Sequence, residues 1–140
     1  MSKSSLRTSP IPRGIRNNNP LNIRIGNTWL GEVPNPTDSE FEQFVSARYG
    51  LRAGFCILRR YIKRYGKNTI AKIIPTWAPS SENDVESYIR IVCTRSKLER
   101  DAILSYDDKP TMCALVSAMC VAECGQTIPY DIIESSYDIA

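Results

Sequence analysis

One short segment, RGIRNNNPLNIR at residues 13–24, concentrates side-chain amides in a way that could serve binding. Its four asparagines are Asn17, Asn18, Asn19 and Asn22. Each amide offers a hydrogen-bond donor and an acceptor, which suits the hydroxyl and N-acetyl groups of a glycan. Pro20 restricts the preceding residue to an extended backbone, which could turn Asn19 outward. The alternative is structural, because asparagine side chains also satisfy the backbone of turns.

The second candidate for chemistry is Glu123, which follows the apolar run MCALVSAMCVA. Ser117 is the only polar member of this run, so a helix over about residues 111–123 should be buried on all sides. Gly125 stands where a helix commonly ends. Burial and the negative end of the helix dipole would both raise the pKa of Glu123, which would keep it protonated as a general acid. The alternative is a solvated glutamate without a chemical role.

The residue types that are missing narrow the chemistry further. The chain has no histidine, which excludes Ser-His-Asp triads, Cys-His nucleophile pairs and histidine-ligated zinc. Its five cysteines form no CxxC pair, so no metal or other cofactor is predicted. The cysteines are interpreted as buried free thiols, with a disulfide formed in an oxidising space as the alternative. A hydrolase of this composition would rely on carboxylate acid–base catalysis, which is most common in glycosidases.

Further side chains are predicted to contact a glycan. Trp29 and Trp77 could present flat faces to sugar rings, although core packing is the alternative for both. The other predicted substrate-binding residues are Arg24, Glu82, Asn83, Tyr88, Gln126 and Tyr130. Glu82 and Asn83 precede an apolar helical pattern, where a purely structural capping role is the alternative. A second catalytic carboxylate, where a mechanism needs one, would come from Glu32, Asp38, Glu40 or Glu42, each of which is otherwise a solvated charge.

Charge and hydropathy limit the partners. The formal net charge of +3 is mild, and nothing approaches the run of about 18 apolar residues that spans a membrane. A stripe of basic residues follows one predicted helix: Arg59, Arg60, Lys63, Arg64 and Lys67. We interpret this stripe as a solvated helix face, so nucleic acid is an unlikely partner. The first residues lack the apolar segment of a secretory signal. We therefore expect synthesis in the cytoplasm, and delivery by other means if the protein acts on the cell wall.

The pattern along the chain predicts an α+β fold that is mostly α-helical. Three short strands of a small antiparallel sheet are expected near the N-terminus, at residues 22–25, 28–30 and 41–45. Helices are then expected over about 51–65, ended by Gly66, and from Ile70 after a cap at Asn68, ended early by Pro75. A further helix should start at Ser81, and the apolar helix ending at Glu123 should be central. Residues 1–12 are predicted to be a flexible arm before a single domain of residues 13–140.

Several blocks resemble a family of small phage-encoded proteins. They are RGIRNNNPLNIR, GNTWLGE, FEQFVSARYGLRAGFCIL, YGKNTIAKIIPTWAPSSENDVESYIRIV and VAECGQTIPY, and the match covers about residues 13–130. The family pattern has glycine at the position of Leu21, histidine at Ala122 and asparagine at Cys124, but it retains Glu123. Proteins of this family are described as virion structural proteins or as lysozyme-like domains.

The resemblance implies two functions of different classes. VSAMCVAECG is similar to the segment of lytic transglycosylases in which an apolar helix ends in a catalytic Glu-Ser-Gly. The pattern NN-x-x-NIR, followed by W-x-G and F…F, resembles the sheet region of bacterial glucosaminidases. Because the order is reversed here, the resemblance implies a circularly permuted lysozyme-like domain. The first function is a peptidoglycan lytic transglycosylase or muramidase, with Glu123 as general acid, that acts in the periplasm or cell wall. The alternative is a non-catalytic structural or glycan-binding protein of a virion or secretion apparatus.

Overall fold

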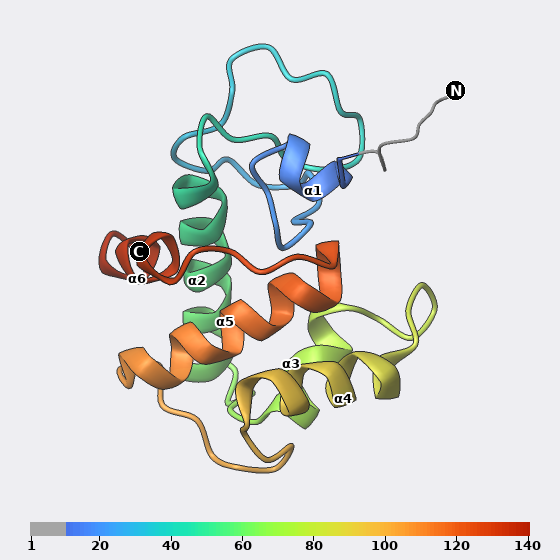
Figure 1. Ribbon diagram of the computed structural model, residues 1–140, viewed down its shortest axis with the longest axis vertical. Coiled ribbons are helices and arrows are strands. Elements are labelled where there is room, and N and C mark those ends of the chain that lie inside the picture. The colour runs from blue at the N-terminus through green and yellow to red at the C-terminus, as the bar shows by residue number, and fades with distance from the viewer. Residues whose placement is uncertain (1–10) are drawn as a thin grey trace.

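The computed structural model describes residues 11–140, so most of the predicted arm, residues 1–12, lies outside the described residues. Within that range the chain forms six helices: α1 Arg13–Arg16, α2 Ala47–Lys63, α3 Ile70–Trp77, α4 Val85–Ser96, α5 Lys109–Cys124 and α6 Tyr130–Asp138. Helix α5 crosses the middle of the molecule, with α1 and the N-terminal loops on one side and α3 and α4 on the other (Figure 1). It packs against α4 and α6, and α6 also packs against α2.

The predicted α+β class, with an antiparallel sheet at the N-terminus, is wrong. Between residues 11 and 140 the structure contains no strand. The region has only two isolated antiparallel bridges, Arg24 with Phe41 and Glu32 with Phe44, and the predicted segment 28–30 takes part in neither. One reason is the backbone of Asn22, whose φ of 52° is left-handed and interrupts the first predicted strand. The region is therefore a set of loops held by side chains.

Asn19 supplies much of that support. Its side chain is fully buried, and its Nδ2 donates to the carbonyl oxygens of Ile23 at 2.9 Å and Glu42 at 3.0 Å. Its Oδ1 accepts from the Ile23 backbone N–H at 3.0 Å. The amide thus bridges the Ile23 N–H and the Glu42 carbonyl, two groups that a sheet would pair with each other, while the Ile23 carbonyl still accepts from the Glu42 N–H at 3.0 Å. This bridging is a second reason why no ladder extends here.

Replacing Asn19 by alanine is expected to lower the free energy of unfolding by about 3 kcal/mol, because buried backbone groups lose their partner. Urea denaturation followed by circular dichroism would measure the change. Asn27→Ala is the matched control. Because Asn27 is exposed, this variant should have nearly the same free energy of unfolding as the wild type. A loss for Asn19→Ala no larger than the control's would contradict the structural role of this amide.

Two glycines let the asparagine-rich loop approach α2. A Cβ at Gly50 would collide with the backbone oxygen of Asn18, and a Cβ at Gly54 would collide with the side chain of Leu21. Leu21 is completely buried there, so the leucine that departs from the family pattern fills the contact with α2. This contact fixes the loop against the helix that lines the site described below.

The predicted buried central helix is confirmed. Helix α5 begins at Asp108, whose side chain accepts from the Thr111 backbone N–H, and ends at Gly125, whose φ of 72° is left-handed. Its fully or almost fully buried residues are Met112, Cys113, Leu115, Val116, Ala118, Met119 and Cys120. The stop of α2 near Gly66, with φ of 66°, was also predicted correctly.

The boundaries of α3 and α4 differ from the prediction. Thr69, not Asn68, caps α3, and the helix continues past Pro75 to Trp77. Pro75 removes one intrahelical bond, while burial of Ile73 and Ile74 and a 2.8 Å bond from the Ala78 N–H to the Ile74 oxygen hold the last turn.

Helix α4 starts after the cap Asp84, three residues later than the Ser81 capping box predicts. Glu82 and Asn83 therefore lie in the loop before the helix, not in its first turn.

The five cysteines all lie in the described part, where their thiols are free. Cys113 and Cys120 are buried, as predicted, whereas Cys56, Cys93 and Cys124 are only half-buried. Among the described helices, none has the length and hydropathy needed to cross a bilayer.

Candidate functional site

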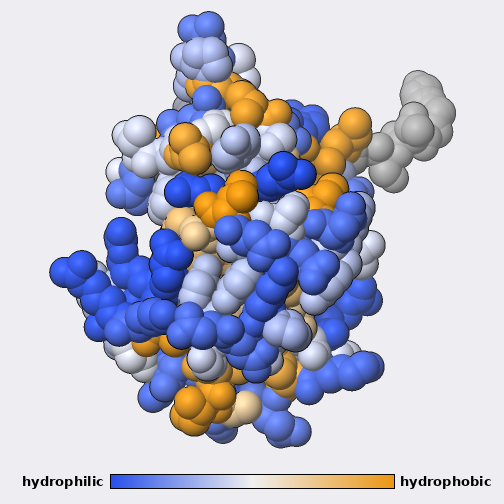
Figure 2. Space-filling model, turned by 90° about the vertical axis from the view of Figure 1, so that its left-hand side faces the viewer, coloured by the Kyte–Doolittle hydropathy of each residue, from blue (hydrophilic) through white to orange (hydrophobic). Residues whose placement is uncertain are grey.

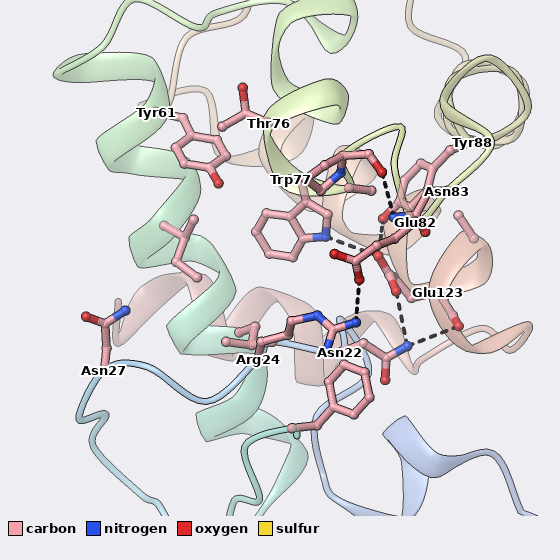
Figure 3. A pocket seen from close by; sticks show the side chains of 16 residues that line it. Asn22, Arg24, Asn27, Tyr61, Thr76, Trp77, Glu82, Asn83, Tyr88 and Glu123 are labelled. Carbon is pink, nitrogen blue, oxygen red and sulfur yellow. Dashed lines mark hydrogen bonds and ion pairs between the residues drawn. The ribbon is translucent and has the colours of Figure 1, made fainter. Parts of the chain in front are cut away.

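Glu123 lies at the last turn of α5, where segments from four parts of the chain meet (Figure 3). Its Oε2 accepts from the Tyr88 hydroxyl at 2.8 Å and from the Trp77 Nε1–H at 3.2 Å. Its Oε1 accepts from the Asn22 Nδ2 at 3.1 Å, and the same Nδ2 lies 3.3 Å from the Glu123 carbonyl oxygen. The carboxyl group is thus held by the N-terminal loop, α3 and α4 together.

Burial is the largest influence on the Glu123 carboxyl, and it raises the pKa above its ordinary value. The hydrogen bonds from Tyr88, Asn22 and Trp77 act in the opposite direction, because donors stabilise the charged form. Tyr88 is itself buried, and its burial together with the Glu123 charge raises the phenol pKa well above 10. Tyr88 therefore remains a donor over the whole physiological pH range.

A cavity of about 600 Å³ opens beside this carboxyl group. Aromatic side chains line one part of it, and Tyr61 meets Trp77 edge-on with ring centroids 6.4 Å apart. Amides and charged groups line the rest. The lining residues labelled in Figure 3 are Asn22, Arg24, Asn27, Tyr61, Thr76, Trp77, Glu82, Asn83, Tyr88 and Glu123.

An ion pair joins two sides of the cavity. The Arg24 Nη2 lies 2.7 Å from the Glu82 Oε1, so the N-terminal loop is linked to the loop before α4. The Arg24 guanidinium also stacks over the Phe41 ring, 4.8 Å from its centroid. Both charged side chains are more than half exposed, so the pair contributes little to stability and is free to contact a ligand.

The structure brings together about half of the predicted site. Seven predicted residues line the cavity: Asn22, Arg24, Trp77, Glu82, Asn83, Tyr88 and Glu123. Six do not: Asn17, Asn18, Asn19, Trp29, Gln126 and Tyr130. The three consecutive asparagines serve the loop, as in Asn17 Nδ2 donating to Asp38 at 3.0 Å and Asn18 Nδ2 donating to the Phe44 oxygen at 3.0 Å. Asn22 is the member of the group that faces Glu123.

The four acidic residues considered as a second carboxylate, Glu32, Asp38, Glu40 and Glu42, are not among the cavity-lining residues. Asp38 holds the N-terminal loop through Arg13 at 2.7 Å, and this contact keeps the pKa of Asp38 far below its usual range. Burial and the neighbouring Glu32 raise the pKa of Glu42 to about 6. Glu82 is the acidic side chain that shares the cavity with Glu123.

Several lining residues were not predicted from the sequence, although Ile57 and Tyr61 carried a detectable signal. They stand four residues apart on α2, beside the apolar stripe that marks its buried face, so they form a second, adjoining stripe. No three acidic or cysteine side chains in residues 11–140 come together in a way that could hold a metal ion.

Comparison with known proteins identifies the family to which the chain belongs. Protein P5 of Pseudoalteromonas phage PM2 is 40% identical over 131 residues, which cover 90% of this chain and 80% of that protein. The chain belongs to the family of phage PM2 protein P5. The expected phage-encoded family is thereby confirmed. No family model matches the sequence.

Proposed function

We propose that this member of the P5 family cleaves the glycan strands of peptidoglycan, with Glu123 as the general acid. The single observation that carries the proposal is the buried carboxyl group at the end of α5, open to a cavity and fixed by Tyr88, Trp77 and Asn22. A raised pKa lets such a group hold a proton near neutral pH and release it to a leaving oxygen.

The hydrogen bonds favour Oε1 as the oxygen that delivers the proton. Oε2 already accepts from both Tyr88 and Trp77. Oε1 accepts only from Asn22, whose Nδ2 has a second acceptor nearby in the Glu123 carbonyl oxygen. When Oε1 is protonated, the Asn22 Nδ2 needs only to shift its hydrogen bond from Oε1 to the Glu123 carbonyl oxygen. The Oε1 hydroxyl is then free to donate its proton toward the cavity.

The cavity lining supports a sugar as the bound group. Trp77, Tyr61 and Phe41 offer apolar ring surfaces, on which the C–H faces of sugar rings pack. Asn22, Asn27 and Asn83 offer amides for hydroxyl and N-acetyl groups. The resemblance of VAECG to the glutamate segment of lytic transglycosylases supports the same substrate class.

In the reaction proposed here, Glu123 transfers its proton to the glycosidic oxygen as the C1–O bond breaks. In the transglycosylase form, the C6 hydroxyl of the same sugar then attacks C1, and its proton returns to Glu123. In the hydrolase form, a water molecule attacks instead, and a second carboxylate assists it or stabilises the sugar cation. The cavity contains one further carboxylate, Glu82, which Arg24 holds as an ion pair.

The decisive experiment incubates the purified protein with purified peptidoglycan and identifies the soluble fragments by mass spectrometry. Release of muropeptide fragments is expected, and an anhydro-sugar end, one water lighter than a hydrolysed end, would identify a transglycosylase. If intact peptidoglycan yields no fragments under any condition in which the protein remains folded, the enzymatic proposal fails. The protein would then be better described as a glycan-binding or structural component of a virion or secretion apparatus.

Glu82→Gln distinguishes the two chemical forms. If the reaction is a transglycosylation, we expect less than about a tenfold loss of activity, because the exposed ion pair with Arg24 contributes little energy. A loss comparable to that of removing the Glu123 proton would instead favour a two-carboxylate hydrolase. Initial rates of fragment release for wild type, Glu82→Gln and the surface control Glu99→Gln would measure the difference.

The source of the relative also supports action on a cell wall. A phage crosses the wall of its bacterial host when it enters and when it leaves, and the P5 relative is encoded by a phage. The proposal places the site of action in the periplasm or cell wall, reached through a virion or a secretion machine.

A further inference from the structure

A second hollow, of about 600 Å³, adjoins the first along α2. Five of its lining residues are cationic, and none is acidic: Arg52, Arg59, Arg60, Lys63 and Arg64. The opposite wall comes from the loop at Thr28, Trp29 and Leu30, of which Leu30 is 60% exposed. We call this hollow the basic groove. The side of the molecule on which α2 and α6 lie in Figure 1 is largely hydrophilic, with small hydrophobic groups among the polar ones (Figure 2).

Most of the charge in the basic groove is not neutralised by the protein. Within residues 11–140, Lys63 is the only one of the five with an acidic partner, Asp107 at 2.9 Å. Arg60, in the last turn of α2, and Arg64, its C-cap, stand four residues apart, a like-charge spacing that destabilises a helix. Several of these cations contact aromatic rings, Arg59 and Lys63 with Tyr106 and Arg64 with Tyr65, but such contacts leave the positive charge in place. The charges of the groove are therefore available for an anionic ligand.

The two hollows are built from the same two segments. Helix α2 gives Ile57 and Tyr61 to the cavity beside Glu123, and gives Arg60 and Arg64 to the basic groove. These two pairs lie on adjacent faces of the helix. The loop likewise gives Asn27 to the first hollow and the next three residues to the second. The two hollows are therefore neighbours along both segments, and one extended polymer is expected to reach both.

We propose that the basic groove is an exosite for the peptidoglycan strand, in which the arginines bind carboxylates of its peptide stems. This inference rests on the proposed function, and it assigns separate tasks to the two hollows: sugar rings beside Glu123, and acidic peptide in the groove. Four of the five cations are arginines, whose planar guanidinium groups pair with carboxylates through two parallel hydrogen bonds. Trp29 and Leu30 add apolar surface for the aliphatic parts of the stems.

The test is binding to purified, insoluble peptidoglycan, measured as the protein that sediments with it. The full chain carrying Glu123→Gln is used, so that cleavage does not remove the ligand. The double variant Arg60→Gln/Arg64→Gln, made in the same background, is expected to bind about tenfold more weakly. Both arginines are exposed, so the fold should be retained, and thermal melting verifies this.

The matched control is Arg90→Gln/Arg95→Gln, which removes two exposed arginines from α4, outside both hollows. It loses the same net charge and should bind like the parent. Binding of the parent should also weaken as salt is raised, and the groove variant should lose most of that dependence. Equal weakening in both double variants would show only a general charge effect and would overturn the proposal.

Two further ligands test the identity of the polymer. Duplex DNA and vesicles containing anionic phospholipid offer phosphates in place of carboxylates, and binding to either should be weaker than binding to peptidoglycan. Tighter groove-dependent binding to DNA or to vesicles would replace the present proposal.

The two experiments can refute the exosite proposal and the catalytic proposal independently of each other. If the wild type releases no fragments but groove-dependent sedimentation persists, catalysis is refuted and the exosite stands. If fragments are released and the groove variant binds like its parent, the exosite is refuted and catalysis stands.

Discussion

Glu123→Gln is expected to reduce peptidoglycan cleavage by about 10²–10⁴-fold, the contribution of a general acid. Glutamine keeps the size of the side chain and an oxygen that can accept from Tyr88 and Trp77, but it has no proton to transfer to the leaving oxygen. Initial rates of muropeptide release, with protein concentration matched by absorbance, would measure the loss. The exposed Glu99→Gln variant is the control and should retain full activity.

The same substitution should not destabilise the protein near neutral pH. Burial raises the pKa of Glu123 above the ordinary value of 4.5, so the folded state holds this proton to a higher pH than the unfolded state does. The free energy of unfolding contributed by the group therefore falls as the pH rises from about 4.5 through the raised pKa. Because glutamine cannot ionise, the variant does not lose this unfolding free energy as the pH rises. The stability thus retained offsets the cost of rearranging the hydrogen bonds around the new amide.

Thermal melting of the wild type and Glu123→Gln between pH 4 and pH 8 tests the sign of this linkage, and the variant should lose less stability as the pH rises. A variant that is inactive because it unfolds would melt much lower at every pH, and this would separate a purely structural carboxylate from a catalytic one. Equal activity of folded wild type and folded Glu123→Gln would refute the role of Glu123.

The sequence predicted the central feature of the site because it depends on a local pattern. An apolar run with one polar residue, followed by a glutamate and a glycine, indicates a buried helix that ends at a carboxyl group, and α5 has this form. Periodicity also located α2 and the stop near Gly66. These features depend on residues within a few helical turns of one another.

The loops were harder to predict because their structure depends on contacts between distant residues. The alternation at residues 22–25 and 41–45 is typical of strands, but Asn19 competes for the backbone groups of Ile23 and Glu42, and Asn22 turns left-handed. The sequence alone likewise could not separate the three consecutive asparagines, which hold the loop, from Asn22, which contacts a residue 101 positions away. The later start of α4 leaves Glu82 and Asn83 in the loop before the helix, where both line the cavity.

Tyr88→Phe is expected to lower the rate of cleavage by about tenfold and to shift its pH dependence to higher pH. The tyrosine acts as a positioning residue, because its hydroxyl donates to the Glu123 Oε2 at 2.8 Å and fixes the carboxyl group. Phenylalanine preserves the buried ring, so the cost in stability should be about 1 kcal/mol. Tyr61→Phe is the matched control, since Tyr61 lines the same cavity but its hydroxyl makes no hydrogen bond to Glu123 in the described structure.

The direction of the pH shift follows from the effect of the lost donor. A hydrogen bond to a carboxylate stabilises its charged form, so the Tyr88 hydroxyl lowers the pKa of Glu123 against the larger effect of burial. Without it the pKa rises further, and the acid stays protonated to higher pH. Because a general acid works only while protonated, kcat/KM falls above the pKa of Glu123, and this alkaline limb should move upward in Tyr88→Phe but stay in place in Tyr61→Phe. A residue that only supported the fold would reduce the amount of active protein without moving the limb, so an unshifted profile in Tyr88→Phe would refute its role in setting the protonation of Glu123.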